Sequence, residues 1–520
     1  MTAGAPFYDT ATIWELVERR AVASPDATLA VDEHDRRITF GELRDRAERV
    51  AAGLHALGVG DGTPVTWQLP TRLESLVVWA ALARLRATQN PIISMYRERE
   101  VGFALRQTGA HVFLVPGVWR GFDFAAMGEQ LGKDMERPPL IVVADETLPE
   151  GDPATLPPHC VDDTDPIRWV YYTSGTTSDP KGVLHTDRTL LAGGKAMAVA
   201  YDLTPADIGS IAFPFAHVGG ADYIVAMLAV GFAAVTVEVF DPPAAIELFR
   251  RHGVTMAGGS TAFYQAFVVE QRRQPGHTMI PTLRLLSGGG APKPPEVYYE
   301  VRREIGVPVV HGYAMTEIPM CAMGSLGDTD EQLADTAGPP VTGAEIRAVL
   351  PDGSVAAPGV DGELRVRGTM VCKGYTDAAL TAEAFDDDGW FRTGDLGHVR
   401  SDGRVVVTGR IKDIIIRKGE NVSAKELEDL LYEHPKVADV AVIGLPDRER
   451  GERVCAVVEQ ASGEEPLEFD EMVGYLRAAG LMVQKIPEQL EVVDELPRNQ
   501  TLHKVLKSQL RDVYATKPWR

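Results

Sequence analysis

Positive charge is scarce in this sequence. Its 520 residues include 52 lysines and arginines against 74 aspartates and glutamates, which gives a formal net charge of −22. Nucleic acids and anionic membrane surfaces attract proteins with the opposite balance. We therefore expect neither as the main partner, and an anionic ligand would need local positive sites.

Cysteine is scarce as well. Cys160, Cys321, Cys372 and Cys455 are scattered along the chain with no paired spacing. This pattern argues against a zinc site and against a disulfide framework. It predicts reduced thiols in a cytoplasmic protein.

Long hydrophobic runs are missing too. Met1–Thr12 has no basic region and no apolar core, so we expect no signal peptide. The longest apolar stretch, Tyr223–Val237, is broken by Gly231 and is too short for a convincing membrane span. It predicts a buried helix followed by a strand.

The remaining composition is that of a globular protein, with 45% hydrophobic and 24% charged residues. The length predicts one large domain plus a smaller one. Helical patterns at Trp14–Val22 and Phe40–Leu57 alternate with β-branched runs such as Thr63–Gln68. This alternation, which continues through the first 400 residues, predicts an α/β fold with largely parallel sheets.

The pattern changes near residue 410. Ser423 and Glu426 have the spacing of a capping box and open a helix. Short strands over 437–443 and 453–458 follow, and then a helix over 471–479. The sequence thus predicts a large N-terminal domain of layered sheets and helices over residues 1–410 and a small α+β C-terminal domain over 411–520.

The most informative stretch is residues 172–182, which read Tyr-Thr-Ser-Gly-Thr-Thr-Ser-Asp-Pro-Lys-Gly. Backbone N–H groups, hydroxyls and one cation in such a loop can wrap a polyphosphate. Pro180 precedes the lysine, and the residues after it read as extended, so this is not a Walker A loop opening a helix. With a strand predicted over Ile167–Tyr172, the loop is expected to join two strands.

This loop resembles the phosphate-binding signature of the adenylate-forming superfamily: acyl-CoA synthetases, adenylation domains and beetle luciferases. Other family motifs follow in the family's order over nearly the whole chain. The resemblance implies activation of a carboxylate with ATP and Mg²⁺ to an acyl-adenylate, then acyl transfer to a thiol, here of coenzyme A. The phosphate-loop residues that it assigns are Thr173, Ser174, Gly175, Thr176, Thr177 and Lys181.

Two further motifs supply more of the predicted nucleotide site by resemblance. The glycine-rich turn and the segment that follows it contribute Gly288, Gly289, Gly290, Ala291, Pro292, His311 and Gly312. Tyr313 would stack on adenine, Thr316 would contact phosphate and Glu317 would hold Mg²⁺, the last two serving catalysis. Mg²⁺ prefers hard oxygen ligands and is often held by one or two carboxylates plus phosphate oxygens.

The last motifs along the chain are predicted to contact the ribose, to form the hinge between the domains and to line the thiol tunnel. By resemblance, Asp395 accepts hydrogen bonds from the ribose hydroxyls and Arg410 is a second nucleotide contact. Lys412 occupies the family's hinge position, about which the small domain swings between the two half-reactions. The loop that would line the coenzyme A tunnel in the second state comprises Lys418, Gly419 and Glu420.

The acyl pocket is predicted around a gating histidine, His217, which would lie between that pocket and the thiol tunnel and serve catalysis. Amino-acid-activating domains usually place an aspartate in this segment, and its absence between Phe213 and Gly220 disfavours an amino-acid substrate. Ala314 stands where the family often has glycine, so its methyl is expected to intrude on the pocket. The full predicted set is His217, Val218, Gly219, Gly258, Ser260, Gly288, Gly312, Ala314 and Met315.

The catalytic lysine of the family is assigned to Lys504. The family's usual Gly-Lys pair lacks its glycine here, and alignment on Lys-Val-Leu-Lys at residues 504–507 selects Lys504 rather than Lys507. A lysine with an ordinary pKa of about 10.4 stays charged near neutral pH and can stabilise developing negative charge.

Together these motifs favour an ATP-dependent acyl-CoA synthetase for a medium-chain, alicyclic or aromatic acid. Two alternatives stay open: a stand-alone adenylating enzyme that loads a carrier protein, and a non-catalytic acyl- or nucleotide-binding relative. The sequence does not select the acid, and it leaves a homodimer open.

Overall fold

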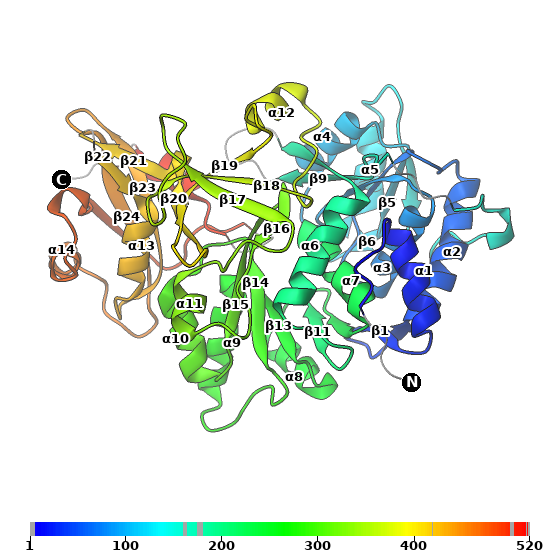
Figure 1. Ribbon diagram of the computed structural model, residues 1–520, viewed down its shortest axis with the longest axis horizontal. Coiled ribbons are helices and arrows are strands. Elements are labelled where there is room, and N and C mark those ends of the chain that lie inside the picture. The colour runs from blue at the N-terminus through cyan, green and yellow to red at the C-terminus, as the bar shows by residue number, and fades with distance from the viewer. Residues whose placement is uncertain are drawn as a thin grey trace.

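The computed structural model describes residues 6–159, 164–173, 180–418, 420–499, 504–515 and 517, with Glu420 and Asn421 described by their backbone alone. A large mixed α/β body contains the N-terminal part of the chain, and a smaller body contains the C-terminal part (Figure 1). This agrees with the predicted fold class.

The phosphate-loop prediction falls on the edge of a mostly parallel sheet with strand order β10-β9-β4-β3-β5-β8. Only β9 and β10 pair antiparallel, and residues 174–179 between them lie outside the described residues. The predicted strand–loop–strand arrangement is therefore seen in its two strands. The strands are β3 (Pro64–Trp67), β4 (Thr88–Pro91), β5 (Val112–Val115), β8 (Leu140–Val143), β9 (Trp169–Thr173) and β10 (Lys181–His185).

Two further sheets flank the centre of the large body. One has the order β11-β12-β1-β2, with β1 (Thr28–Val31), β2 (Arg37–Thr39), β11 (Ile208–Ile211) and β12 (Ala233–Thr236). The other has the order β13-β14-β15-β16, with β13 (Met256–Gly259), β14 (Leu285–Gly289), β15 (Val309–Met315) and β16 (Ile318–Ala322). Strands β13, β14 and β15 are parallel, so their carboxyl ends share one edge.

The expectation of largely parallel sheets fails for residues 344–410, which form an antiparallel sheet. Its strands are β17 (Ala344–Val349), β18 (Gly362–Gly368), β19 (Phe391–Val399) and β20 (Val405–Arg410). Between β19 and β20 the connection over residues 400–404 is too short for the crossover that parallel neighbours need. Asp402-Gly403 makes the turn, with Gly403 at φ +84°. A small ribbon of β6 (Val118–Trp119) and β7 (Phe122–Asp123) lies outside these sheets.

Helices cover the sheets of the large body. The predicted helices at 14–22 and 40–57 are observed, and Thr39 and Glu42 form a reciprocal capping box at the second. The helices are α1 (Ile13–Ala23), α2 (Phe40–Ala56), α3 (Leu73–Arg84), α4 (Glu98–Thr108), α5 (Phe124–Gly132), η1 (Pro153–Thr155), α6 (Asp187–Ala200), α7 (Val218–Val230), α8 (Pro242–His252), α9 (Thr261–Arg273), α10 (Pro295–Glu304), α11 (Asp330–Asp335) and α12 (Ala378–Ala384).

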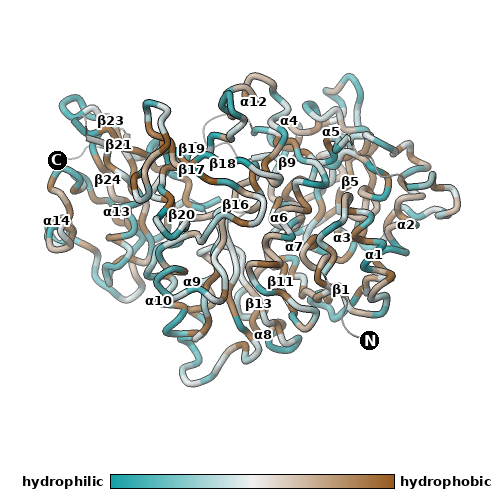
Figure 2. Tube along the Cα trace, in the orientation of Figure 1, coloured by the Kyte–Doolittle hydropathy of each residue, from teal (hydrophilic) through white to brown (hydrophobic). Residues whose placement is uncertain are grey.

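Helix α7 lies at the centre of this body, against α6 and α1. It is apolar on nearly every side, which is the pattern of a fully buried helix. Strand β12 follows it, as predicted for Tyr223–Val237. Figure 2 shows the contrast with outer elements such as α10, which is largely hydrophilic.

The structure also bears on the lack of long hydrophobic runs and on the few cysteines. Within the described ranges, no helix combines the length and the apolar character needed to cross a membrane. Cys321, Cys372 and Cys455 are buried free thiols, whereas Cys160 lies outside the described residues.

The C-terminal body is a sheet, in the order β22-β21-β24-β23 with β25 beside β24, covered by helices. Its strands and helices are β21 (Ile414–Arg417), β22 (Glu420–Ser423), β23 (Val437–Asp447), β24 (Gly451–Gln460), β25 (Gln489–Val493), α13 (Ala424–Tyr432), α14 (Phe469–Ala478), η3 (Val483–Lys485) and α15 (Lys507–Ala515). The predicted elements are present, and both predicted strands are longer than expected. Ser423 caps α13, but the carboxylate of Glu426 pairs with Lys485 at 2.6 Å instead of completing a capping box.

The hydrophobic cores of the two bodies are separate. The core of the large body extends to Val405, and that of the small body begins at Ile415. The short η2 turn (Ile411–Asp413) connects them. The proposed boundary between residues 410 and 411 lies in this interval and stays a prediction.

The contact of α6 with α7 gives a test of the packing. A Cβ at Gly194 would lie 2.5 Å from Val225 Cγ1 and 2.6 Å from the Asp222 carbonyl oxygen. We expect Gly194→Ala to lower the free energy of unfolding by about 1–3 kcal/mol, as measured by denaturant titration, because α7 must shift. Gly474→Ala in α14 is the matched control, since nothing lies within 4 Å of the added methyl, and it should stabilise by about 0.5–1 kcal/mol. Equal stability of the two variants would contradict the packing.

Candidate active site

One cavity of ≈ 790 Å³ collects most of the predicted site residues from both bodies. It is lined by α6, α7, the carboxyl ends of β13 to β15, the β19–β20 sheet, the hinge and the C-terminal segment. The predicted residues that line it are Thr173, Lys181, His217, Val218, Gly219, Gly288, Gly289, Gly290, Ala314, Met315, Thr316, Glu317, Arg410, Lys412 and Lys504. A volume of this size is typical of a small-molecule site.

The other predicted residues lie elsewhere. Ser174, Gly175, Thr176, Thr177 and Gly419 lie outside the described residues, as does the side chain of Glu420. Gly258, Ser260 and Gly312 are buried behind the cavity wall, where Gly259 is the lining residue instead. Ala291, Pro292, His311, Tyr313 and Asp395 support the wall without lining it, and Lys418 lies at the β21–β22 turn.

Asp395 is the centre of the predicted ribose site. Its carboxylate is 4% exposed, accepts a hydrogen bond from the Tyr313 hydroxyl at 2.6 Å and pairs with Arg410 Nε at 2.7 Å. The β19–β20 register places Asp395 directly opposite Arg410, which is why the pair forms. An ionised carboxylate can accept about four hydrogen bonds, so acceptor sites remain for ribose hydroxyls.

His311 fixes the predicted adenine turn from behind. Its Nε2 contacts the Ala291 carbonyl oxygen at 2.7 Å, so this nitrogen carries the proton. Its Nδ1 then accepts from the Tyr264 hydroxyl at 3.1 Å. Burial lowers the pKa of His311 to about 3, which keeps the ring neutral. A Cβ at Gly288 would lie 2.2 Å from that same hydroxyl, so packing in the sheet already requires glycine there.

The carboxylate of Glu317 is the candidate metal ligand. Its Oε1 accepts a hydrogen bond from the Tyr375 hydroxyl at 2.8 Å, and the Lys181 ammonium lies 5.4 Å above the ring of Tyr375. Among the described residues no group of three or more His, Cys, Asp or Glu side chains could hold a metal ion. One carboxylate is enough for a candidate Mg²⁺ site, because Mg²⁺ usually keeps several waters and binds through one or two carboxylates plus phosphate oxygens.

His185 holds the Thr316–Glu317 turn in place. Its Nε2 donates to the carbonyl oxygen of Thr316 at 2.8 Å, and its Nδ1 lies 2.9 Å from Thr189 Oγ1. Burial lowers the pKa of His185 to about 4, so the ring is neutral at physiological pH. The turn is therefore tied to α6, and the sequence alone did not predict this contact.

Lys504 enters the cavity from the C-terminal body. Its backbone N–H donates to Asn499 Oδ1 at 3.0 Å and its carbonyl accepts from the Asn499 N–H at 2.8 Å. Desolvation, with the nearby positive charges of Arg410 and Lys412, lowers the pKa of Lys504 to about 8. Lys507 lies instead at the start of α15 and pairs with Glu428 at 2.7 Å. Of the two lysines, Lys504 is the one that lines the cavity.

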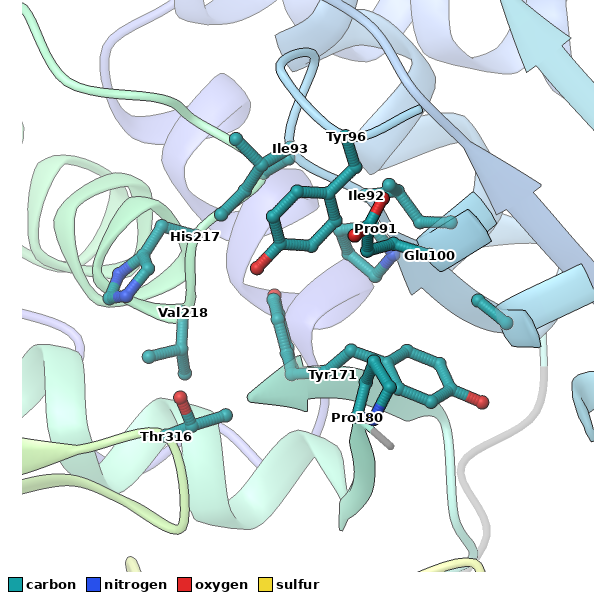
Figure 3. Close-up of a pocket in the computed structure, with 13 residues that line it drawn as sticks. Pro91, Ile92, Ile93, Tyr96, Glu100, Tyr171, Pro180, His217, Val218 and Thr316 are labelled. Carbon is teal, nitrogen blue, oxygen red and sulfur yellow. The ribbon is translucent and has the colours of Figure 1, made fainter. Parts of the chain in front are cut away.

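His217 is the N-cap of α7. Its Nδ1 accepts from the Gly219 N–H at 3.2 Å, so Nε2 carries the proton in the neutral ring. Desolvation, and secondarily the charge of Lys504, lowers the pKa of His217 to about 4. The ring also borders a second, narrow pocket of ≈ 20 Å³, where it lies across from Tyr96 and Tyr171 (Figure 3). The structure thus gives this residue a capping contact as well as its position between two pockets.

The hinge region connects the cavity to the small body. Lys412 lines the cavity, while its neighbour Asp413 pairs with Arg511 of α15 at 2.9 Å. Burial, and then the charge of Arg410, lowers the pKa of Lys412. The two bodies also meet through a hydrogen bond from the Gln265 side chain to the Tyr432 hydroxyl.

Several lining residues had no signal in the motif analysis. Met197 and Tyr201 of α6, with Asp222 and Tyr223 of α7, line the inner part of the cavity. The signal that could have found one of them is charge, because Asp222 is the only ionisable carboxyl within the apolar run over 218–230.

Comparisons with known proteins agree with this geometry. A family model described as AMP-binding enzyme matches residues 17–376, and one described as AMP-binding enzyme C-terminal domain matches residues 426–502. The chain is 30% identical to medium-chain fatty-acid–CoA ligase of Escherichia coli over 513 residues, covering 96% of this chain and 90% of that protein. It is 32% identical to salicyl-AMP ligase / salicyl-S-ArCP synthetase of Mycobacterium tuberculosis over 515 residues, covering 95% and 89%.

A solved structure extends the likeness to three dimensions. O-succinylbenzoate coenzyme A synthetase from Bacillus subtilis, in complex with ATP and magnesium ion, matches with a TM-score of 0.81 at 28% identity. The match covers 96% of this chain and 99% of that one.

The lowered pKa of Lys504 can be measured directly. We expect labelling of Lys504 by an amine-reactive reagent, followed by mass spectrometry, to show a pH midpoint near 8. The reason is that only the neutral amine reacts, and desolvation beside other cations favours the neutral form. A midpoint at the ordinary lysine value of about 10.4 would contradict the burial of this side chain.

Proposed function

Because the chain belongs to the AMP-binding enzyme family and is an acid–thiol ligase of the acyl-CoA synthetase type, we propose how its own residues carry out the two half-reactions. The first forms an acyl-adenylate and pyrophosphate from a carboxylic acid and ATP. The second forms a thioester with coenzyme A and releases AMP. The observation that carries this proposal is the convergence of Lys504, Glu317 and Arg410 on one cavity.

The first half-reaction needs no nucleophile from the protein. A carboxylate oxygen of the substrate bonds to the α-phosphorus in line, and the bond from that phosphorus to the bridging oxygen of pyrophosphate breaks. The ammonium of Lys504 lies where the carboxylate and the α-phosphate meet, and Lys181 with the phosphate loop holds the β- and γ-phosphates. Mg²⁺, held by Glu317, would neutralise charge that develops on the phosphate oxygens. Asp395, Tyr313 and Arg410 orient the nucleoside.

The second half-reaction requires Lys504 to leave. The small domain turns about Lys412, and the loop with Lys418, Gly419 and Glu420 comes to line the coenzyme A tunnel. The thiol sulfur bonds to the acyl carbon, the bond from that carbon to the AMP oxygen breaks, and His217 lies at the passage between thiol and acyl pocket.

The acid is proposed to be medium-chain, alicyclic or aromatic. Gly219, Ala314 and Met315 line the cavity, and the relatives include enzymes named for medium-chain fatty acids and for salicylate. The relative named salicyl-S-ArCP synthetase is the reason that a protein-bound thiol is kept as the second acceptor.

The decisive experiment measures pyrophosphate release with a panel of acids, with and without coenzyme A, in the wild type and two lysine variants. Lys504→Ala should slow acyl-adenylate formation by roughly 10²–10³-fold, because one charge contact to the transition state is lost. It should still convert supplied acyl-adenylate and coenzyme A to the thioester. Lys507→Ala is the matched control and should leave adenylation nearly unchanged.

Three results would each revise the proposal. Loss of adenylation in Lys507→Ala with full activity in Lys504→Ala would move the catalytic lysine to residue 507. Thioester formation only with a carrier protein would change the acceptor. Failure of every acid to release pyrophosphate would reject the ligase function itself.

The role of His217 is tested by two variants, because this residue also caps α7. If it serves the thiol step, His217→Ala and His217→Asn should both slow thioester formation more than adenylation. Asparagine is a good N-cap and alanine is not, so only the alanine variant should also lose about 1 kcal/mol of stability. Single-turnover assays of each half-reaction supply the comparison, and equal loss in both half-reactions would assign His217 to acid binding or structure.

A further inference from the structure

A carboxyl group without a partner lies in the wall of the acyl pocket. Asp222, in the second turn of α7, lines the cavity and is only 2% exposed. Its Oδ1 is buried, and no donor from the described part of the chain reaches it. Buried polar atoms in proteins nearly always have a hydrogen-bond partner, so an exception calls for a reason.

The neighbouring helix makes room for this group. A Cβ at Gly193 of α6 would lie 2.4 Å from Asp222 Oδ1 and 2.9 Å from Pro319 Cβ. Glycine inside a helix lowers its stability relative to alanine. The glycine therefore accommodates a carboxyl that an ordinary side chain at this position would displace.

Two tyrosine hydroxyls that line the same part of the cavity bond elsewhere. The Tyr201 hydroxyl donates to the Val310 carbonyl oxygen at 3.3 Å, and the Tyr223 hydroxyl accepts from the Ser210 N–H at 2.9 Å. Burial raises the pKa of Asp222 well above its usual range, which favours the neutral carboxyl. A neutral carboxyl both donates and accepts hydrogen bonds.

We propose, building on the ligase function above, that Asp222 recognises a hydroxyl or amino group carried by the acid at the end remote from its reacting carboxylate. The unpartnered oxygen Oδ1 is enclosed against Gly193, so a ligand in the cavity would bond to the other oxygen of the Asp222 carboxyl, Oδ2. The substrate class is thereby narrowed to acids with a polar, hydrogen-bonding far end.

The geometry of α7 sets where that group lies. Val218 and Gly219 line the cavity beside His217, and Asp222 and Tyr223 line it one helical turn further along. One turn advances about 5.4 Å along the helix axis. The recognised group is therefore several bonds away from the carboxylate, which rules out the α-amine of an amino acid and agrees with the absence of an aspartate between Phe213 and Gly220.

The test compares matched acids of one length that end in a hydroxyl, an amino or a methyl group, in both straight-chain and aromatic series. We expect the wild type to favour the hydroxyl-ended or amino-ended acid over the methyl-ended one. The ratio of kcat/KM for pyrophosphate release should be roughly 10²-fold or more, because a site built for a hydrogen bond rejects analogues that lack it. Asp222→Leu should abolish or invert that ratio.

A second variant separates the two polar groups and guards against misfolding. Asp222→Asn keeps the shape and the hydrogen-bonding capacity of the side chain but has no charge to offer. If this variant still prefers the hydroxyl-ended acid over the methyl-ended one, the group that Asp222 recognises is a hydroxyl. If it loses activity with the amino-ended acid alone, the recognised group is an ammonium that pairs with the Asp222 carboxylate. Gly219→Ala is the control for shape: its methyl would lie 3.5 Å from His217 Nδ1, so it changes the size ranking and leaves the polar-to-methyl ratio unchanged.

Direct binding of the same acids, measured by calorimetry, keeps the two proposals distinguishable. If acids are activated but the polar-to-methyl ratio is the same in the wild type and Asp222→Leu, the inference about Asp222 is wrong and the ligase function stands. If no acid releases pyrophosphate yet polar-ended acids bind more tightly to the wild type than to Asp222→Leu, the ligase function is wrong and the inference stands. Absence of both effects overturns both.

Discussion

The buried carboxylate of Asp395 holds together the parts of the structure on which the site depends. It accepts a hydrogen bond from Tyr313 on β15 and pairs with Arg410 at the end of β20. A buried charge is costly unless it is paired, so these three side chains define one another's positions. Arg410 immediately precedes the η2 turn that leads to the small body. The predicted ribose contact and the predicted hinge are thus neighbours in one bonded unit.

Charge is distributed against the trend of the whole chain. The protein carries a net charge of −22, yet Lys181, Arg410, Lys412 and Lys504 all line one cavity. Clustered cations disfavour one another's charged forms, which contributes to the lowered pKa of Lys504. An anionic ligand relieves that repulsion. Binding of an anion beside these cations would therefore favour the charged form of Lys504.

Local patterns in the sequence predicted much of the fold. Capping residues and apolar periodicity located α1, α2 and α13, and aromatic or β-branched runs located β3 and β9. The antiparallel sheet over 344–410 was missed because strand direction depends on connections rather than on strand composition. Motif resemblance named many of the residues that line the cavity, but it also named Tyr313 and Asp395, which support the wall without lining it. The resemblance assigned Gly258, Ser260 and Gly312 to the acyl pocket, but these residues lie behind the cavity wall and Gly259 lines it instead. Which residue lines a cavity depends on which face of the strand meets it, and a motif does not show that. The contacts of His185 with Thr316 and of Tyr375 with Glu317 join distant segments, so neither residue alone indicated them.

The glycines of α6 bring two helices close enough for backbone to touch side chain. At Gly194 the nearest atoms across the contact belong to Val225 and to the carbonyl of Asp222, which leaves no slack for α7 to slide. The inner wall of the cavity is consequently stiff. The shape of this wall is then set by the side chains that project into the space, such as Met197 and Tyr223. Because α7 carries His217 at its N-cap and Asp222 one turn further along, the same tight contact with α6 fixes the spacing between these two side chains.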